Sequence, residues 1–235
     1  MSLALQRIAD ELSALYDTPR LPDVAAFLCD EATMRDAVGP EVDRGEVLVV
    51  LEEDGVSFVG LYVAAEVLDA LAEEGTGESS RVGGVSDPRS FRTWQLAVEG
   101  VSHLVYLCFR ADREQSVSAL ELELQAEVDK WALGLLRPRM EAHPLAGWGA
   151  PRLAQSRSLR RRLFADARFL DEPGTEAGDR YRTANRIAAG FVEGLEARHL
   201  RLDAARGERA LVGELRRFYR DGGADKLAVA ARRAP

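Results

Sequence analysis

The sequence predicts an α+β fold that is mostly helical, with a small sheet built around a hairpin at about residues 45–63. Apolar residues recur at spacings of three and four along most of the chain, which is the period of an amphipathic helix. One segment is instead rich in valine and leucine on both sides of an Asp-Gly pair, which indicates two strands and a tight turn. With 235 residues, 46% apolar and 30% charged, the chain is long and apolar enough to bury a substantial core.

Two helices are predicted before the hairpin. The first has one apolar face, formed at spacings of three and four by Leu5, Ile8, Leu12 and Leu15. Residues 17–22, which include two prolines, end this helix. A second helix is predicted over about 23–38, where Gly39 and Pro40 close it.

The hairpin at 45–63 turns at Asp54-Gly55, a pair that tolerates positive φ angles. Both faces of its first strand are apolar, so we expect helices to cover the strand on both sides. A two-stranded sheet is marginal on its own. Further strands, from elsewhere in the chain or from a second subunit, are therefore expected to complete it.

Long helices are predicted after the hairpin. A helix over about 64–74 leads into a glycine-rich, loop-like stretch at 75–87. Two antiparallel helices joined near residues 112–116 account for the helical spacing of Phe91, Trp94, Val98, Val101, Val105 and Cys108 and of the apolar residues at 117–135. The alternative is that residues 101–109 form a buried strand, because Val, Tyr, Leu and Phe crowd this run after Gly100.

The charge of the chain changes sign near residue 150. Residues 1–150 carry 12 basic and 27 acidic side chains, a net charge of −15, whereas residues 151–235 carry 19 and 12, a net charge of +7. Prolines and glycines at 137–151 mark the same place. We therefore predict an acidic α+β domain at 1–137 and a basic, all-helical region at 152–235 that packs on it by charge attraction.

Composition also bears on the compartment and on chemistry. The sequence contains no apolar run of about 18 residues, and charge interrupts its start too early for a signal peptide. We expect a cytoplasmic protein without a membrane partner, in which Cys29 and Cys108 are buried free thiols. Only Lys130 and Lys226 among the 31 basic residues are lysines, and this bias weakens any function assigned to an arginine.

One candidate catalytic site combines carboxylates and an imidazole from two predicted helices: Glu99, His103, Glu123 and Glu127. Such residues between helices could form a metal- or carboxylate-dependent active site, with the metal unknown. A further Glu-x-x-His pair lies at Glu196 and His199, but a di-iron bundle uses two such pairs. Glutamates at these spacings are also explained by helix propensity and by exposed ion pairs with Lys130. No cofactor is predicted, because the glycine-rich loop at 75–79 lacks the lysine of a phosphate-binding loop.

A second candidate site is an arginine cluster that could bind an anion or a partner: Arg157, Arg160, Arg161 and Arg162. Clustered cations are what phosphate contacts require. The overall pI of 5.1 and the arginine bias argue against nucleic acid, so pairing with the acidic half is favoured.

The leading hypothesis is therefore an interaction or assembly protein without catalysis of its own, which binds a protein partner or itself. The enzyme with a site between helices is the alternative, and the phosphate or nucleic-acid binder is the third.

Overall fold

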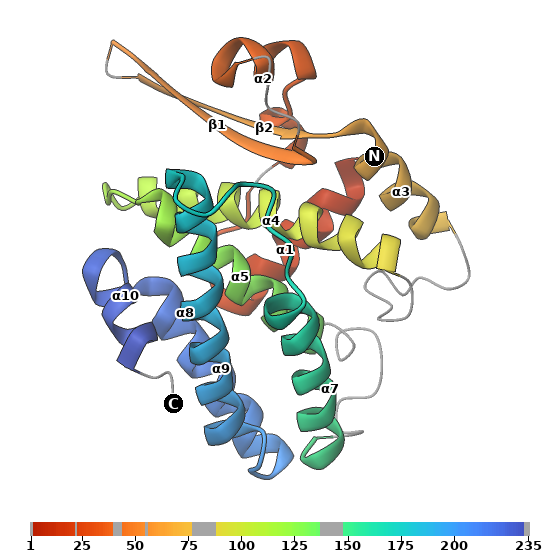
Figure 1. The fold of residues 1–235 in the computed structure, drawn as a ribbon, viewed down its shortest axis with the longest axis vertical. Coiled ribbons are helices and arrows are strands. Elements are labelled where there is room, and N and C mark those ends of the chain that lie inside the picture. The colour runs from red at the N-terminus through yellow and green to blue at the C-terminus, as the bar shows by residue number, and fades with distance from the viewer. Residues whose placement is uncertain are drawn as a thin grey trace. The chain divides into compact units, whose positions relative to one another are not determined.

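The computed structural model describes residues 2–21, 23–39, 44–54, 56–76, 88–136 and 148–232. The chain divides into two compact units: the first comprises Met1–Ala14 and Pro19–Cys108, and the second comprises Leu15–Thr18 and Phe109–Pro235. The elements before residue 112 are α1 (Ser2–Tyr16), η1 (Val24–Phe27), α2 (Glu31–Val38), β1 (Glu46–Glu53), β2 (Val56–Val63), α3 (Ala65–Thr76) and α4 (Pro88–Ala111) (Figure 1). After it come α5 (Ala119–Leu136), α7 (Ala150–Arg160), η2 (Arg161–Ala165), α8 (Glu176–His199), α9 (Ala204–Arg220) and α10 (Gly223–Arg232). The predicted class is confirmed: the described chain is mainly helical, with one small antiparallel sheet.

The first helix forms as its apolar spacing predicts. Leu5, Ile8 and Leu12, which belong to the first unit, are at most 1% exposed, so the stripe is buried. The last turn of α1 belongs to the second unit, where Tyr16 is buried.

The single helix predicted over 23–38 is wrong in its middle, because η1 ends at Phe27 and α2 begins at Glu31. Leu28 instead forms an isolated bridge with Leu61 of β2, and the Cys29 N–H donates to the Leu61 carbonyl at 3.0 Å. Asp30 then caps α2 by accepting from the Thr33 N–H at 2.8 Å. Tertiary pairing with a strand thus outweighs helix propensity here.

The predicted hairpin is present. β1 and β2 pair antiparallel, in a register that runs from Glu46 opposite Val63 to Glu53 opposite Val56. Asp54 adopts the positive φ expected at the turn, +51°, while Gly55 lies outside the described residues. Among the described residues the sheet consists of these strands and the Leu28 bridge, so no third strand completes it there.

Helical cover of β1 on both faces is correct only at the base of the hairpin. On one face, α4 packs closely at Gly100, where an added Cβ would lie only 3.0 Å from the Leu61 side chain. On the other, the Sγ of Cys29 lies 3.3 Å from the Cβ position of Gly60, and α2 packs against the hairpin. The far end of the hairpin extends past α2 (Figure 1), and its apolar side chains are exposed.

Residues 101–109 are helical, so the alternative of a buried strand is wrong. Five residues of the predicted stripe of α4 are buried: Phe91, Trp94, Val98, Val101 and Val105. Cys29 and Cys108 form no disulfide, as predicted, but each is only partly buried.

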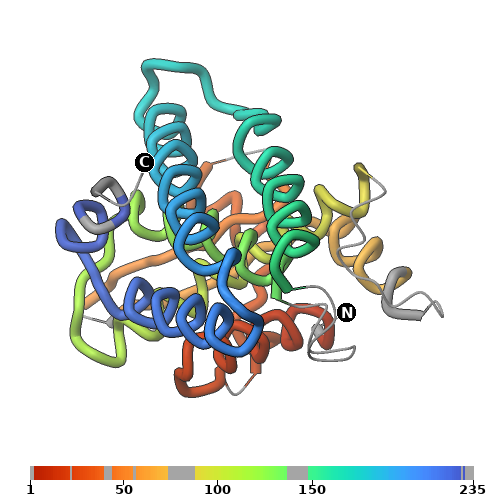
Figure 2. Tube along the Cα trace, turned by 90° about the horizontal axis from the view of Figure 1, so that it is seen from below, coloured from red at the N-terminus to blue at the C-terminus, as the bar shows by residue number. Residues whose placement is uncertain are grey.

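In the second unit, residues 148–232 contain only helices, as predicted. α7 and α8 lie side by side in both views and are joined through residues 166–175 (Figures 1 and 2). The buried stripe of α8 includes Phe191 and Leu195, and that of α9 includes Leu211, Leu215 and Phe218. The domain division at 137–152 stays a prediction, because residues 137–147 lie outside the described part.

Candidate functional site

The residues of the predicted catalytic site are divided between the units. Glu99 and His103 lie on the part of α4 that belongs to the first unit, and Glu123 and Glu127 lie on α5 in the second. Within the first unit, the Nδ1 of His103 is 3.9 Å from the Oε2 of Glu46, and both side chains are buried. Neither unit by itself brings the four residues together, and this site stays a prediction.

The glutamates of α5 have cationic neighbours in the second unit. Glu127 Oε1 pairs with Lys130 Nζ at 2.9 Å, which confirms the predicted pair, but Lys130 is buried rather than exposed. Glu123 Oε1 lies 3.6 Å from the Arg180 guanidinium. Among the described residues no three His, Cys, Asp or Glu side chains gather as metal ligands would.

Glu196 and His199 do not share a site, although they lie one turn apart on α8. Glu196 accepts from the Ser156 hydroxyl at 2.7 Å and from Arg160 at 3.1 Å, and burial raises the pKa of its carboxyl. The Nε2 of His199 lies 2.5 Å from Glu214 of α9. Each side chain fastens α8 to a different neighbouring helix.

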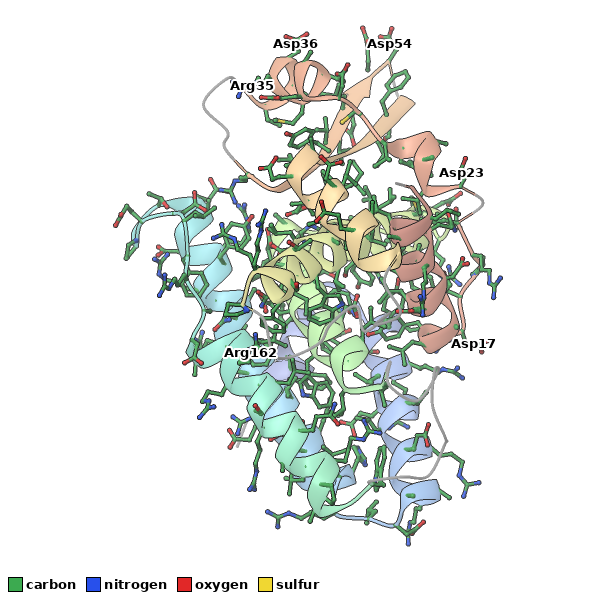
Figure 3. The ribbon with its side chains drawn as sticks, turned by 90° about the vertical axis from the view of Figure 1, so that its right-hand side faces the viewer. Asp17, Asp23, Arg35, Asp36, Asp54 and Arg162 are labelled. Atoms are coloured by element: carbon green, nitrogen blue, oxygen red, sulfur yellow. The ribbon has the colours of Figure 1, made fainter. Side chains whose placement is uncertain are left out.

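The arginine cluster lies on α7 and η2. Arg160 is engaged by Glu193 and Glu196 of α8, whereas Arg157 and Arg161 are exposed and Arg162 (Figure 3) is partly buried. An anion-binding role for this cluster stays a prediction.

Within the second unit, ion pairs connect residues of the acidic part of the sequence with residues of the basic part. Arg180, from the basic part, pairs with Glu123, from the acidic part. Arg216 reaches Asp17 at 4.0 Å, and its Nε donates to the Leu15 carbonyl at 2.7 Å. These contacts join residues that are far apart in the chain.

A buried polar cluster that was not predicted from the sequence lies in the second unit and is formed by Tyr16, Gln125, Asp129 and Lys226. Gln125 and Asp129 lie side by side on α5 because they are four residues apart. The Tyr16 hydroxyl and the Gln125 amide both donate to Asp129, the latter at 2.7 Å. Lys226 Nζ of α10 donates to the Gln125 Oε1 at 2.5 Å. Three helices thus meet through one hydrogen-bonded network.

The start of α10 is held on α5 beside this cluster. Glu121 Oε1 accepts from the Gly223 N–H at 2.6 Å, and its Oε2 accepts from the Ser118 N–H at 3.1 Å in a capping box. A Cβ at Gly222 would lie 2.1 Å from the Arg110 guanidinium, so a side chain there would displace Arg110.

The electrostatics of the cluster follow from its burial. Burial lowers the pKa of Lys226 to about 7, against the opposing effect of Asp129 and Glu121, while Arg110 lowers it further and Asp221 raises it. Burial and then the Asp129 carboxylate raise the pKa of Tyr16.

Aromatic rings complete the surroundings of the ammonium group. Lys226 Nζ lies 4.6 Å from the ring centre of Phe218 and 5.8 Å from that of Tyr219, and Tyr219 stacks on Tyr16 at 3.9 Å.

This cluster is enclosed. Tyr16, Gln125 and Lys226 are 0% exposed and Asp129 is 1% exposed, so a ligand has no access to it in this conformation. Its role is therefore to fasten the end of α1 and α10 onto α5. The rarity of lysine was the signal that could have identified it, since both lysines of this arginine-rich chain are buried.

The accessible candidate is the far end of the hairpin, which we call the hairpin end (residues 50–53 and 57–59). Leu51 and Phe58 lie opposite each other in the register and are 46% and 57% exposed. Val50, on the other face, is 44% exposed. Asp54 follows at the outer tip, beyond the apolar residues (Figure 3). Exposed apolar side chains therefore lie here beside a strand edge with which no other strand pairs among the described residues.

Comparisons with protein-family models, with curated proteins and with solved structures find no match to this chain. None of the described helices combines the length and apolar character that crossing a membrane requires.

Proposed function

We propose that this chain is a protein-interaction protein that binds its partner through the hairpin end. The observation that carries the proposal is the exposed pair Leu51 and Phe58, adjacent across the two strands. Single exposed apolar residues are ordinary, but large ones gathered at adjacent positions are typical of a surface that a protein covers.

The marginal stability of the sheet supports the same proposal. In the part of the chain that the structure describes, the two eight-residue strands pair only with each other at their far end, so the outer edge of β1 meets no other strand there. A partner that pairs with the hairpin would hydrogen-bond to this edge and cover the exposed apolar side chains at the same time.

The experiment is site-specific cross-linking in the full-length protein. A photoreactive amino acid replaces Phe58, and in a matched control it replaces Leu170, which is 68% exposed and lies in the second unit. We expect one adduct of discrete mass from position 58, lost when Leu51→Ser is added, and no adduct from position 170. Absence of an adduct at position 58, or equal adducts at both positions, would contradict the proposal.

A further inference from the structure

The direction of the backbone groups along β1 follows from one hydrogen bond on β2. Because the Leu61 carbonyl accepts from Cys29, the backbone groups of Leu61 point away from β1. Leu48 lies opposite Leu61, so its groups point away from β2. In an antiparallel pair this direction alternates from one residue to the next, so the backbone N–H and C=O groups of Val50 and Glu52 also point away from β2. Among the described residues no strand pairs with this edge.

Within residues 47–51 this edge lacks the proline and the charged side chains that usually prevent pairing between molecules, and its charges, Glu46, Glu52 and Glu53, lie at the two ends of β1. β1 contains no proline and no lysine, and its residues 47–51 are all apolar. It is a regular strand of eight residues with no extra residue opposite β2. Such an edge is a template for another strand of the same character.

We propose that the partner is a second copy of this chain, whose β1 pairs antiparallel with β1 so that Val50 of one copy lies opposite Val50 of the other. This inference rests on the proposed function, for which it names the partner. A two-fold axis perpendicular to the sheet relates the copies. Side chains that lie opposite each other therefore share a face of the sheet, and the axis passes between two identical residues, one from each copy.

The two neighbouring registers are disfavoured, one by the apolar pattern and one by charge. With Leu51 on the axis, Glu52 of each copy would lie opposite Val50 of the other and interrupt the apolar row. With Val49 on the axis, Glu46 of each copy would lie opposite Glu52 of the other, and like charges opposite each other are destabilising. With Leu48 on the axis, pairing would use the base of the hairpin, where Glu46 is 7% exposed, and Leu51 would lie beyond the partner strand. With Val50 on the axis, no two glutamates face each other, the residue opposite Glu46 is Asp54 of the turn, beyond the end of β1, and the exposed half of β1 is used.

The Val50 register also makes continuous apolar rows on both faces. On one face, a row across the four strands consists of Val59 and Val50 of one copy, followed by Val50 and Val59 of the other. On the opposite face, Phe58 and Leu51 of one copy are followed in the row by Val49 of the second copy. Two marginal hairpins become a four-stranded sheet, and the exposed apolar residues gain cross-strand neighbours.

The test is native mass spectrometry of the full chain, with a dimer at twice the chain mass of 25.8 kDa expected for the wild type. Val50→Lys places two ammonium groups opposite each other, and we expect the dimer to weaken at least tenfold. Val38→Lys is the matched control, because Val38 is 41% exposed on α2 and outside the proposed contact. A mixture of Val50→Lys and Val50→Glu should restore a mixed dimer.

Val50→Pro is the second variant. It removes only an outward-pointing N–H and leaves the pairing with β2 intact, so it too should yield a folded monomer. A wild type that is monomeric at all concentrations overturns the inference, and so does a dimer that neither variant weakens. If the monomer still gives a discrete adduct with a different protein from position 58, self-pairing fails while the proposed function survives. If the monomer gives no adduct from position 58, the self-pairing and the proposed function both fail.

Discussion

The hairpin end and the buried polar cluster depart from the usual distribution of side chains in opposite directions. Leu51 and Phe58 expose about half of their surface, whereas Lys226 and Asp129 place charge-bearing groups in the core of the second unit. Burying polar groups is tolerable only where hydrogen bonds compensate, and here every member of the cluster bonds to another. No described residue of its unit covers the exposed side chains of the hairpin end. The comparison indicates that the cluster is complete as it stands and the hairpin end is not.

The largest expected effect comes from breaking the cluster. Asp129→Ala removes the acceptor of Tyr16 and Gln125 and the carboxylate that most favours the charged form of Lys226, so we expect a loss of about 3–5 kcal/mol in the free energy of unfolding. Urea unfolding measures it, with the exposed Asp112→Ala as the control that changes little. A loss no greater than that of the control would mean that the network does not hold the helices together.

Titration of Lys226 tests the same region through pH. Its pKa falls from 10.5 in the unfolded chain to about 7 in the fold. Between these values the unfolded chain holds a proton that the folded chain has released, so the free energy of unfolding rises with pH, by up to about 1.4 kcal/mol per pH unit. Below pH 7 both states are protonated and the contribution is constant. Above pH 10 the raised pKa of Tyr16 acts in the opposite direction, because the unfolded tyrosine loses its proton first.

Two variants isolate this contribution. Lys226→Met should remove the rise between pH 7 and pH 9, and Lys226→Arg should be less stable than Lys226→Met, because a buried guanidinium cannot lose its proton. Urea unfolding at each pH gives the slopes. Equal slopes in the wild type and Lys226→Met would show that Lys226 titrates normally.

The smallest effect is expected at the hairpin end. Phe58→Ser should change the free energy of unfolding of the monomer by less than about 0.5 kcal/mol, because the side chain is already 57% exposed. Phe191→Ala, at a residue with 0% exposure, should cost about 3–5 kcal/mol in the same assay. A large loss from Phe58→Ser would mean that Phe58 stabilises its own unit, and the contrast between the two regions would disappear.

Local sequence patterns predicted most of the secondary-structure elements. The spacing of Leu5, Ile8 and Leu12 was enough to predict α1, since a helix places such residues on one face. The break between η1 and α2 could not be read locally, because it depends on the pairing of Leu28 with Leu61.

The sites depend on contacts between distant residues. Tyr16 and Asp129 are 113 residues apart, and Lys226 and Gln125 are 101 apart, so no spacing rule connects them. The exposure of Leu51 and Phe58 was equally hidden, because an apolar strand normally predicts burial on both faces. The pairing of Glu99 and His103 with Glu123 and Glu127 stays a prediction.

Hydrogen exchange of the wild type at low and high protein concentration compares the two regions directly. We predict that the amides of β1 at Leu48, Val50 and Glu52 gain protection as concentration rises, while those of α5 and α10 around the buried cluster do not change. Protection of β1 that is independent of concentration would contradict the account, because the edge would then need no second copy.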